Sequence, residues 1–590
     1  MLPIIVINRG AAQIVRGRLS WWTMVVFLLM CTLLLGKGVE PVYAEEAATA
    51  ESGKPDISSL LGLASSDPSI QAEALKALVA KNDVVFLPVL TALNEGTLHV
   101  WREAPGSEKI VIILRNIEPD GRETISLLHP FTGEELGKLN ATDVSLEEQL
   151  EMVAMRSGEV RLTLRAGLDR LRLFDPDVEV RRAAAVKIGN AGKTSELPTL
   201  ENALSAEQNE LVRHDIETAL NRLRLQDPEP EVRRAAAIRL GEIKGMRGLS
   251  DMTTLLTEEP VEESEAVKAA LKEAIEKIES YQTVQTIVGS AFNGISLASV
   301  LFMLGLGLAI TYGLMGVINM AHGEMLMIGG YTAFVIQEIF AKYLPPYLHD
   351  SSYLVSLPAS FVVTAAVGLF IERTVIRFLY GRPLETLLAT WGIGMFLQQA
   401  ARWYFGDLTS VNTPTFLRRG VEPMVGLVLP YTRIFIILVA AVSLVGVYLL
   451  LSGTRMGLLV RAVTQNRNMS ACVGISTRTV DSWTFAFGTG LAGVAGSAIS
   501  VIGSVDPEVG KNYIVEAFMV VVLGGVGKLA GTVVSALGIG VATKILEPII
   551  AGTGGSIYAK LFVLAAIILF LQVRPTGLFP AKGRAAEVGT

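Results

Sequence analysis

The sequence predicts a mainly α-helical protein in two parts, a soluble α-solenoid followed by a polytopic α-helical membrane domain. After Gln282, apolar segments of about 20 residues, the length needed to cross a bilayer, crowd the chain. The charges divide at the same place. Residues 283–590 carry 19 basic and 13 acidic side chains, a net charge of +6, and residues 1–282 carry the other 32 and 44, a net charge of −12. A motif repeated within the first part indicates the solenoid.

The amino terminus reads as a secretory signal peptide over residues 1–44. Arg16 and Arg18 precede an apolar run at 21–35, and a small residue, Ala44, stands before the first acidic pair. A basic region, an apolar core and a small residue at the cleavage site are typical of such peptides. An uncleaved anchor helix is the alternative. Either would carry the following domain across the membrane, into the periplasm of a bacterium.

Residues 45–262 contain the internal repeat. Asp175-Pro176 followed by VRRAAA at 180–185 returns 52 residues later as Asp227-Pro228 and VRRAAA at 232–237, and a weaker copy begins at Asp67. The Asp-Pro pair predicts a helix start, with Asp as the N-cap and Pro at the first helical position. The pattern resembles HEAT repeats, which stack as an α-solenoid. Segments 109–115 and 123–128 read as short strands, so we expect a small β insertion.

The repeated arginines have two interpretations. They form a surface for an acidic partner, or they pair with carboxylates of the next repeat, and we favour pairing. The acidic balance of this domain argues against nucleic acid as a partner. Residues 263–282 are predicted to be a helical linker, a charged stalk that leads to the membrane.

The second part contains eight or nine candidate membrane segments. The seventh is short and interrupted by glycines, so it is either a span or a re-entrant half-helix. Two glycine-broken regions, one in each half, favour an inverted repeat with a path at its interface, whereas Ala492, Gly493 and Gly496 are interpreted as close-packing positions. The segments are 284–312, 320–340, 352–372, 385–405, 431–452, 482–503, 514–527, 530–549 and 556–573.

Basic residues in short loops predict the orientation, because such loops tend to stay in the cytoplasm. The loop after the third segment, the loop after the fifth and the tail are all rich in arginine or lysine. Counting back from them places residue 283 outside, in agreement with the signal peptide, and the tail at 581–590 in the cytoplasm. The loop arginines are Arg373, Arg377, Arg382, Arg455, Arg461, Arg467 and Arg478.

The first broken region places Asn319, His322 and Glu324 inside apolar sequence. Polar groups in a bilayer are costly, and irregular backbone at that depth is tolerated where protein or a water-filled cavity covers it. We therefore expect these side chains to line a passage, although they could equally cap the broken helix. Further candidates for the passage are Trp391, Gln398 and Gln399, and the expected hinge glycines are Gly323, Gly524, Gly525 and Gly527.

The sequence does not predict an enzyme. The run from Gly524 to Lys528 is similar to a phosphate-binding loop, but Val522 and Leu529 stand where that motif needs Gly and Ser or Thr. The two cysteines, Cys31 and Cys472, lie far apart, so we expect neither a disulfide framework nor a metal site.

The strings GLMGVINMAHGEMLMIGGYTAF at 313–334 and ETLLATWGIGMFLQQAAR at 385–402 carry a family resemblance. The first string resembles the signature of the membrane permeases of branched-chain amino acid ABC importers, and the other is most similar to their urea-importing branch. The resemblance covers about residues 283–580. It implies a permease domain in the bacterial inner membrane, surrounded by lipid, that binds no cofactor itself. It also implies a second homologous permease, two cytoplasmic ATPase subunits that use ATP, and a periplasmic solute-binding protein.

The same resemblance makes the loop 453–483 the coupling element that meets the ATPase. Its amphipathic pattern, with arginines but few acids, suits docking against a partner, and an ordinary cytoplasmic loop is the alternative. The residues carried over to this role are Arg461, Ala462, Asn466, Asn468, Ala471 and Gly474.

The leading functional hypothesis is inward transport of urea by alternating access. A branched-chain amino acid or short-amide permease is the alternative within the class. A membrane receptor that senses a ligand through its periplasmic solenoid, or an ATP-independent channel, is the alternative from another class.

Overall fold

The computed structural model describes residues 57–65, 67–80, 83–104, 107–117, 123–140, 149–155, 157–258, 262–550 and 554–579. The predicted signal peptide and cytoplasmic tail lie outside these residues. The contacts divide the chain into two compact units, with the boundary between Thr283 and Val284.

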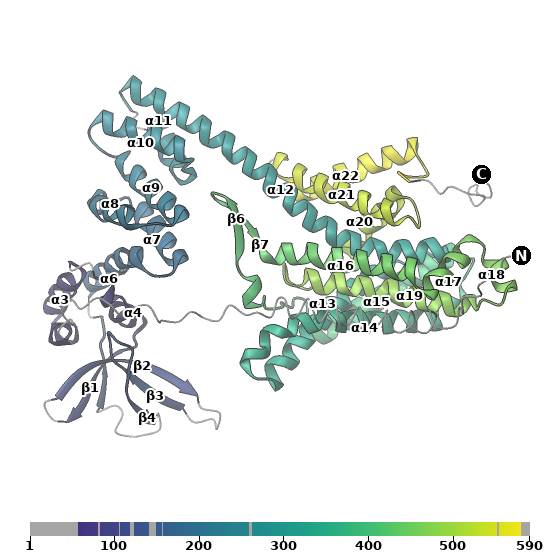
Figure 1. Ribbon diagram of the computed structural model, residues 1–590, viewed down its shortest axis with the longest axis horizontal. Helices are drawn as coiled ribbons and strands as arrows, with labels where there is room; N and C mark the ends of the chain where they lie inside the picture. The colour runs from purple at the N-terminus through teal and green to yellow at the C-terminus, as the bar shows by residue number, and fades with distance from the viewer. Residues whose placement is uncertain are drawn as a thin grey trace, which may run out of the picture. The chain divides into compact units, whose positions relative to one another are not determined.

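The first unit consists of short helices and one β-sheet, and helices α6 to α11 follow one another in a stack (Figure 1). Its apolar core is divided into separate clusters along the stack, as expected where each repeat packs on its neighbours. The helices are α3 (Pro68–Ala80), α4 (Leu87–Glu95), α6 (Gly158–Leu171), α7 (Val178–Ala191), α8 (Leu197–Ala206), α9 (Glu210–Arg224), α10 (Pro230–Ile243) and α11 (Leu249–Thr257).

The β insertion is larger than predicted. The two expected strands are present as β2 (Ser107–Ile117) and β3 (Glu123–Leu128). They lie in a five-stranded antiparallel sheet of order β4-β3-β2-β1-β5 with β1 (Leu98–Ala104), β4 (Glu135–Asn140) and β5 (Leu150–Met152). Strands β4 and β5 are short and carry charged residues, so they contain little apolar alternation to recognise.

The two strong repeats share the same bonds. Arg181 Nε lies 2.6 Å from a carboxylate oxygen of Glu207, and Arg233 Nε lies 2.7 Å from one of Glu262. In each repeat the same guanidinium also donates to both carbonyls of the preceding Asp-Pro pair, at 2.7 and 2.9 Å in the first and 2.8 Å twice in the second. Pairing with a carboxylate is confirmed at these two arginines, but each partner lies within the same 52-residue repeat as its arginine and not in the next repeat as predicted.

The neighbouring arginines diverge. Arg182 pairs with the buried Asp215 at 2.7 Å, whereas the partner of Arg234 among the described residues is the exposed Glu231 of its own helix. The predicted helix start is also wrong in both strong repeats, because α7 and α10 begin three residues after the Asp. The Asp carboxylate instead accepts a hydrogen bond from the backbone two residues on, which makes a turn before the helix. In the weak copy the prediction is correct, since α3 begins at Pro68.

The helical linker predicted at 263–282 is present as the first part of a longer helix, α12 (Glu265–Met315). Its apolar side is buried, with Val267, Leu271 and Ile278 almost fully covered. A Cβ added to Gly241 of α10 would lie 2.9 Å from the Ala274 Cα, so the two backbones approach closely. This segment therefore packs as part of the last repeat and is not a free stalk.

Each of the nine predicted membrane segments coincides with a helix of the second unit. By length and composition, five helices of the described chain could cross a membrane: α12, α14 with its flanks, α16, α21 and α22. The others hold more polar or glycine residues, or are shorter. The remaining bounds are α13 (His322–Tyr343), α14 (Ser352–Thr374), α15 (Pro383–Phe405), α16 (Tyr431–Gly453), α17 (Arg455–Gln465), α18 (Arg467–Cys472), α19 (Thr477–Ile499), α20 (Val509–Gly524), α21 (Leu529–Ile549) and α22 (Gly555–Val573), with a hairpin of β6 (Gly420–Met424) and β7 (Leu427–Pro430) before α16.

Helix α19 is buried along most of its length and packs against α13 and α14. Small residues make this contact close. A Cβ on Gly493 would overlap the Thr364 hydroxyl of α14, and one on Gly496 would overlap the Leu326 carbonyl of α13. Ala492 is fully buried. The interpretation of these three positions as packing residues is confirmed.

Candidate functional site

Both predicted breaks are present. In the first, α12 ends at Met315 and α13 begins at His322, with Gly316 at φ +64°. In the second, α20 ends at Gly524 and α21 begins at Leu529, and two glycines between them also have positive φ. The breaks lie against each other, because a Cβ on Gly313 would be 2.8 Å from the Gly527 Cα.

Two of the four glycines predicted as hinges have a backbone conformation that fits a hinge, and the other two make close packing contacts. Gly525 (φ +91°) and Gly527 (φ +75°) have the left-handed backbone that loosens a helix. Gly323 lies inside α13 without positive φ, where a Cβ would be 2.6 Å from the Gly510 carbonyl oxygen, so it is a packing position. Gly524 is likewise the last residue of α20, packed on Gly531.

The three polar residues of the first break are buried. Asn319 is 2% exposed, His322 0% and Glu324 4%, and Gln398 of α15 is 4% exposed. The Gln398 side-chain amide donates to Glu324 Oε1 at 2.8 Å. Of the six residues predicted for the passage, the structure pairs Glu324 with Gln398 and buries Asn319 and His322 at the same break, with His322 directed at α12.

One side of α15 faces this group. Thr386, Thr390, Gly394 and Gln398 are buried at four-residue spacing, which keeps them on one helix face. Thr390 Oγ1 accepts a hydrogen bond from the backbone of the break at 3.1 Å. A Cβ on Gly394 would lie 3.4 Å from Glu324 Cγ. Helix α15 therefore supplies both polar partners and the space for the carboxylate.

Three polar atoms of the group have no hydrogen-bond partner among the residues that the structure describes: Asn319 Oδ1, His322 Nδ1 and Glu324 Oε2. His322 Nε2 lies 3.2 Å from the Leu304 carbonyl oxygen, which can only accept, so Nε2 carries the hydrogen. In a neutral imidazole Nδ1 is then an acceptor. With Glu324 ionised, all three atoms are acceptors, and buried acceptors left unsatisfied are costly. Each of these atoms could accept a hydrogen bond from an N–H or O–H donor. We call these three residues the acceptor cluster.

Trp391 and Gln399 do not join the acceptor cluster. Trp391 is 54% exposed and Gln399 is also exposed. Each follows a buried residue of α15 by one position, and one position turns a helix by about 100°. Their assignment to the passage stays a prediction.

The predicted coupling residues lie on and around α17 and α18. Arg461, Asn468, Ala471 and Gly474 are exposed and Ala462 is half-buried. Asn466 has a local structural role, because its side chain accepts from the Met469 backbone at 2.9 Å and caps α18. Exposed apolar side chains accompany them, namely Leu458, Met469 and Val473.

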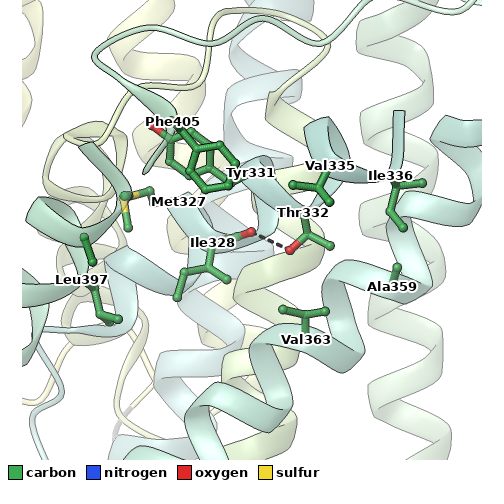
Figure 2. A pocket seen from close by; sticks show the side chains of 12 residues that line it. Met327, Ile328, Tyr331, Thr332, Val335, Ile336, Ala359, Val363, Leu397 and Phe405 are labelled. Atoms are coloured by element: carbon green, nitrogen blue, oxygen red, sulfur yellow. Dashed lines mark hydrogen bonds between the residues drawn. The ribbon is translucent and has the colours of Figure 1, made fainter. Parts of the chain in front are cut away.

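An apolar cavity of about 480 Å³ lies between α13, α14 and α15. Figure 2 shows the Tyr331 ring over that of Phe405, whose centroids are 4.3 Å apart, and the Thr332 hydroxyl bonded to the Ile328 carbonyl at 2.8 Å. The acceptor cluster does not line this cavity. Its walls suit apolar groups, and several of them come from the strings 313–334 and 385–402, although none was predicted as a site residue.

Long apolar helices, two glycine-containing breaks in contact and buried acceptors beside one break define a polytopic membrane protein of the transporter class. Residues 290–571 match the family model described as "Branched-chain amino acid transport system / permease component". The chain belongs to this family of ABC permeases. Its first unit lies outside the matched residues.

Curated relatives agree with the family. A Pseudomonas aeruginosa protein, BraD, described as a high-affinity branched-chain amino acid transport system permease, is 32% identical over 310 residues, which is 51% of this chain and 96% of the relative. LivH of Salmonella typhimurium is 28% identical over 49% of this chain and 93% of its own length. A probable LivH of Methanocaldococcus jannaschii is 28% identical over 48% and 89%. No solved structure matches the chain significantly.

Proposed function

We propose that this chain is the permease subunit of an ATP-driven importer for a small solute rich in N–H groups, with urea as the first candidate. The observation that carries the proposal is the acceptor cluster, whose three buried acceptor atoms come from the six-residue segment 319–324 at one helix break. Urea offers four N–H donors and a single acceptor, so it suits such a group. The resemblance of residues 385–402 to urea importers also supports it.

A branched-chain amino acid is the second candidate. The names of the relatives favour it, and its ammonium group also carries three N–H donors. An ammonium ion would gain from the negative charge of an ionised Glu324, whereas urea needs only acceptor atoms. The two candidates therefore differ in how strongly transport depends on that charge.

The importer would work with partners. A second homologous permease, two cytoplasmic ATPases and a periplasmic solute-binding protein are proposed from the family. Arginines in the loops after α14 and α16 support a cytoplasmic position for those loops, and hence a periplasmic first unit, which we propose as a docking module for the binding protein. The contact between the two breaks supports alternating access with Gly316, Gly525 and Gly527 as hinges.

The test of the acceptor cluster is Glu324→Gln, which keeps the shape but exchanges an acceptor oxygen for a donor amide. A hydrogen bond to a charged group contributes about 1.5–3 kcal/mol, so uptake should fall about tenfold or more. Glu338→Gln is the matched control, since Glu338 is exposed on the same helix. Energy-dependent uptake of labelled urea and leucine is measured in cells. Equal uptake by the two variants would refute a role for the cluster.

The coupling assignment needs a variant without backbone strain. Gly474 has φ +88°, so any side chain there strains the backbone. Ala471→Trp is cleaner, because Ala471 is exposed on α18. We expect Ala471→Trp to insert normally but to lose copurification with the ATPase subunits and ATP-dependent uptake. Normal copurification and uptake would count against α18 as the docking element.

A further inference from the structure

Helix α18 is held to the membrane unit by a buried carboxylate that sequence reasoning did not select. The Asp481 side chain, in the first turns of α19, is 0% exposed and forms an ion pair with Arg467 of α18. The guanidinium makes two bonds to it, Nη2 to Oδ2 and Nη1 to Oδ1, the latter at 3.3 Å. Two parallel bonds fix the orientation of the arginine as well as its distance.

A second carboxylate extends the contact to the connection between α14 and α15. The Arg467 guanidinium lies over the Tyr380 ring, 5.1 Å from its centroid. The Tyr380 hydroxyl donates to Glu372 Oε1 at 3.1 Å, and the Ser482 hydroxyl donates to Glu372 Oε2 at 2.6 Å. Glu372 is 2% exposed, near the end of α14. Arg467 thus contacts α19 and the loop before α15 directly, and Tyr380 and Ser482 connect this contact to α14.

This arrangement resists partial opening. Removing one partner of a buried ion pair leaves an uncompensated charge, which is strongly unfavourable, and a cation over an aromatic ring adds further attraction. Moving α18 alone would leave Asp481 unpaired and uncover the Tyr380 ring. The low-energy movement carries the α14–α15 connection along with α18.

That connection leads to the acceptor cluster. Tyr380 stands three residues before Pro383, where α15 begins. Helix α15 carries Gln398, whose amide is bonded to Glu324. We propose that Arg467, Asp481, Tyr380 and Glu372 form a latch that positions α18 and passes its movement to α15. This rests on the proposed function, because it takes α18 as the element that the ATPase moves.

The latch can be tested at Cys472, an exposed free cysteine at the end of α18. A nitroxide label on Cys472, in full-length protein with Cys31→Ser, reports the mobility of α18 by electron paramagnetic resonance. Asp481→Asn, which keeps the shape of the side chain, should convert the immobile spectrum largely to a mobile one. Arg478→Ala is the matched control, since Arg478 is an exposed arginine of the same loop and should leave the spectrum unchanged.

Transmission of movement from α18 to α15 is tested in the complex that copurifies with its ATPase and is reconstituted in vesicles. Asp481→Asn should keep ATP hydrolysis but lower solute uptake per ATP by about fivefold or more, the lower end of usual site-to-site couplings. Tyr380→Phe keeps the ring but loses the bond to Glu372, so its solute uptake per ATP should lie between the values for Asp481→Asn and the wild type. If the latch only stabilised the fold, Asp481→Asn would lower solute uptake and ATP hydrolysis together and leave uptake per ATP unchanged.

The outcomes are distinct. An unchanged Cys472 spectrum in Asp481→Asn would overturn the latch, and a mobile spectrum with unchanged uptake per ATP would overturn transmission. If the wild type transports neither urea nor leucine, the proposed function fails, yet the spectrum still decides whether the latch holds α18.

Discussion

The repeated arginine of the first unit allows a quantitative prediction. The Glu262 side chain is 3% exposed and Arg233 17%, and two bonds of 2.7 and 2.8 Å join them. Arg233→Ala removes one partner of a buried pair, a change that costs about 3–5 kcal/mol. We expect about 3 kcal/mol, because the Ser264 backbone N–H still donates to Glu262 at 3.0 Å.

The neighbouring arginine is the control. Arg234 is 47% exposed and its partner Glu231 is 72% exposed, so Arg234→Ala should cost about 0.5 kcal/mol or less. Hydrogen–deuterium exchange of peptides from α10, in the full-length protein, measures the free energy of local opening. Since about 1.4 kcal/mol is a factor of ten, Arg233→Ala should exchange roughly 100-fold faster. Exchange within about twofold of the wild type would refute the reasoning.

Two more predictions concern the pH dependence of the Arg233–Glu262 pair and the helix packing at Gly493. The pKa of Glu262 is held below its usual value, chiefly by the hydrogen bond from Arg233. This stabilisation is therefore complete above the ordinary glutamate pKa of about 4.3 and is lost as the pH falls through the lower folded value. The exchange rates of wild type and Arg233→Ala should converge as the pH is lowered below about 4.3, and a constant difference would contradict this. Gly493→Ala should abolish folded protein in the membrane, because the added Cβ would overlap Thr364. The control is Gly446→Ala on α16, which has open space at the Cβ and should express normally. Equal folded yields of the two variants, measured by size-exclusion chromatography, would contradict this prediction.

Features carried by local sequence were predictable. The polar string after Met315 indicated the first break, because buried polar residues interrupt an apolar run only where the backbone or a site requires them. The repeated Val-Arg-Arg-Ala-Ala-Ala motif predicted that its arginines pair with carboxylates, and Arg181 and Arg233 do so through equivalent bonds.

Features that depend on helix phase or distant partners were not predictable. Gln398 and Gln399 are equally polar, and one step of helix rotation decides which of them meets Glu324. Gly316 and Gly323 both stand near the break, and only neighbouring backbones distinguish a loosened turn from a packing contact. In the latch, Ser482 and Glu372 lie 110 residues apart, so nothing local links them.

The most direct test of the importer proposal is uptake of labelled urea and labelled leucine by cells that lack this chain, with the wild-type chain restored in parallel. The account predicts that energy-dependent urea uptake is lost and returns on restoration, while leucine uptake is unchanged. Loss of leucine uptake alone would keep the mechanism but favour the second candidate. Unchanged uptake of both solutes would contradict the proposal for either substrate.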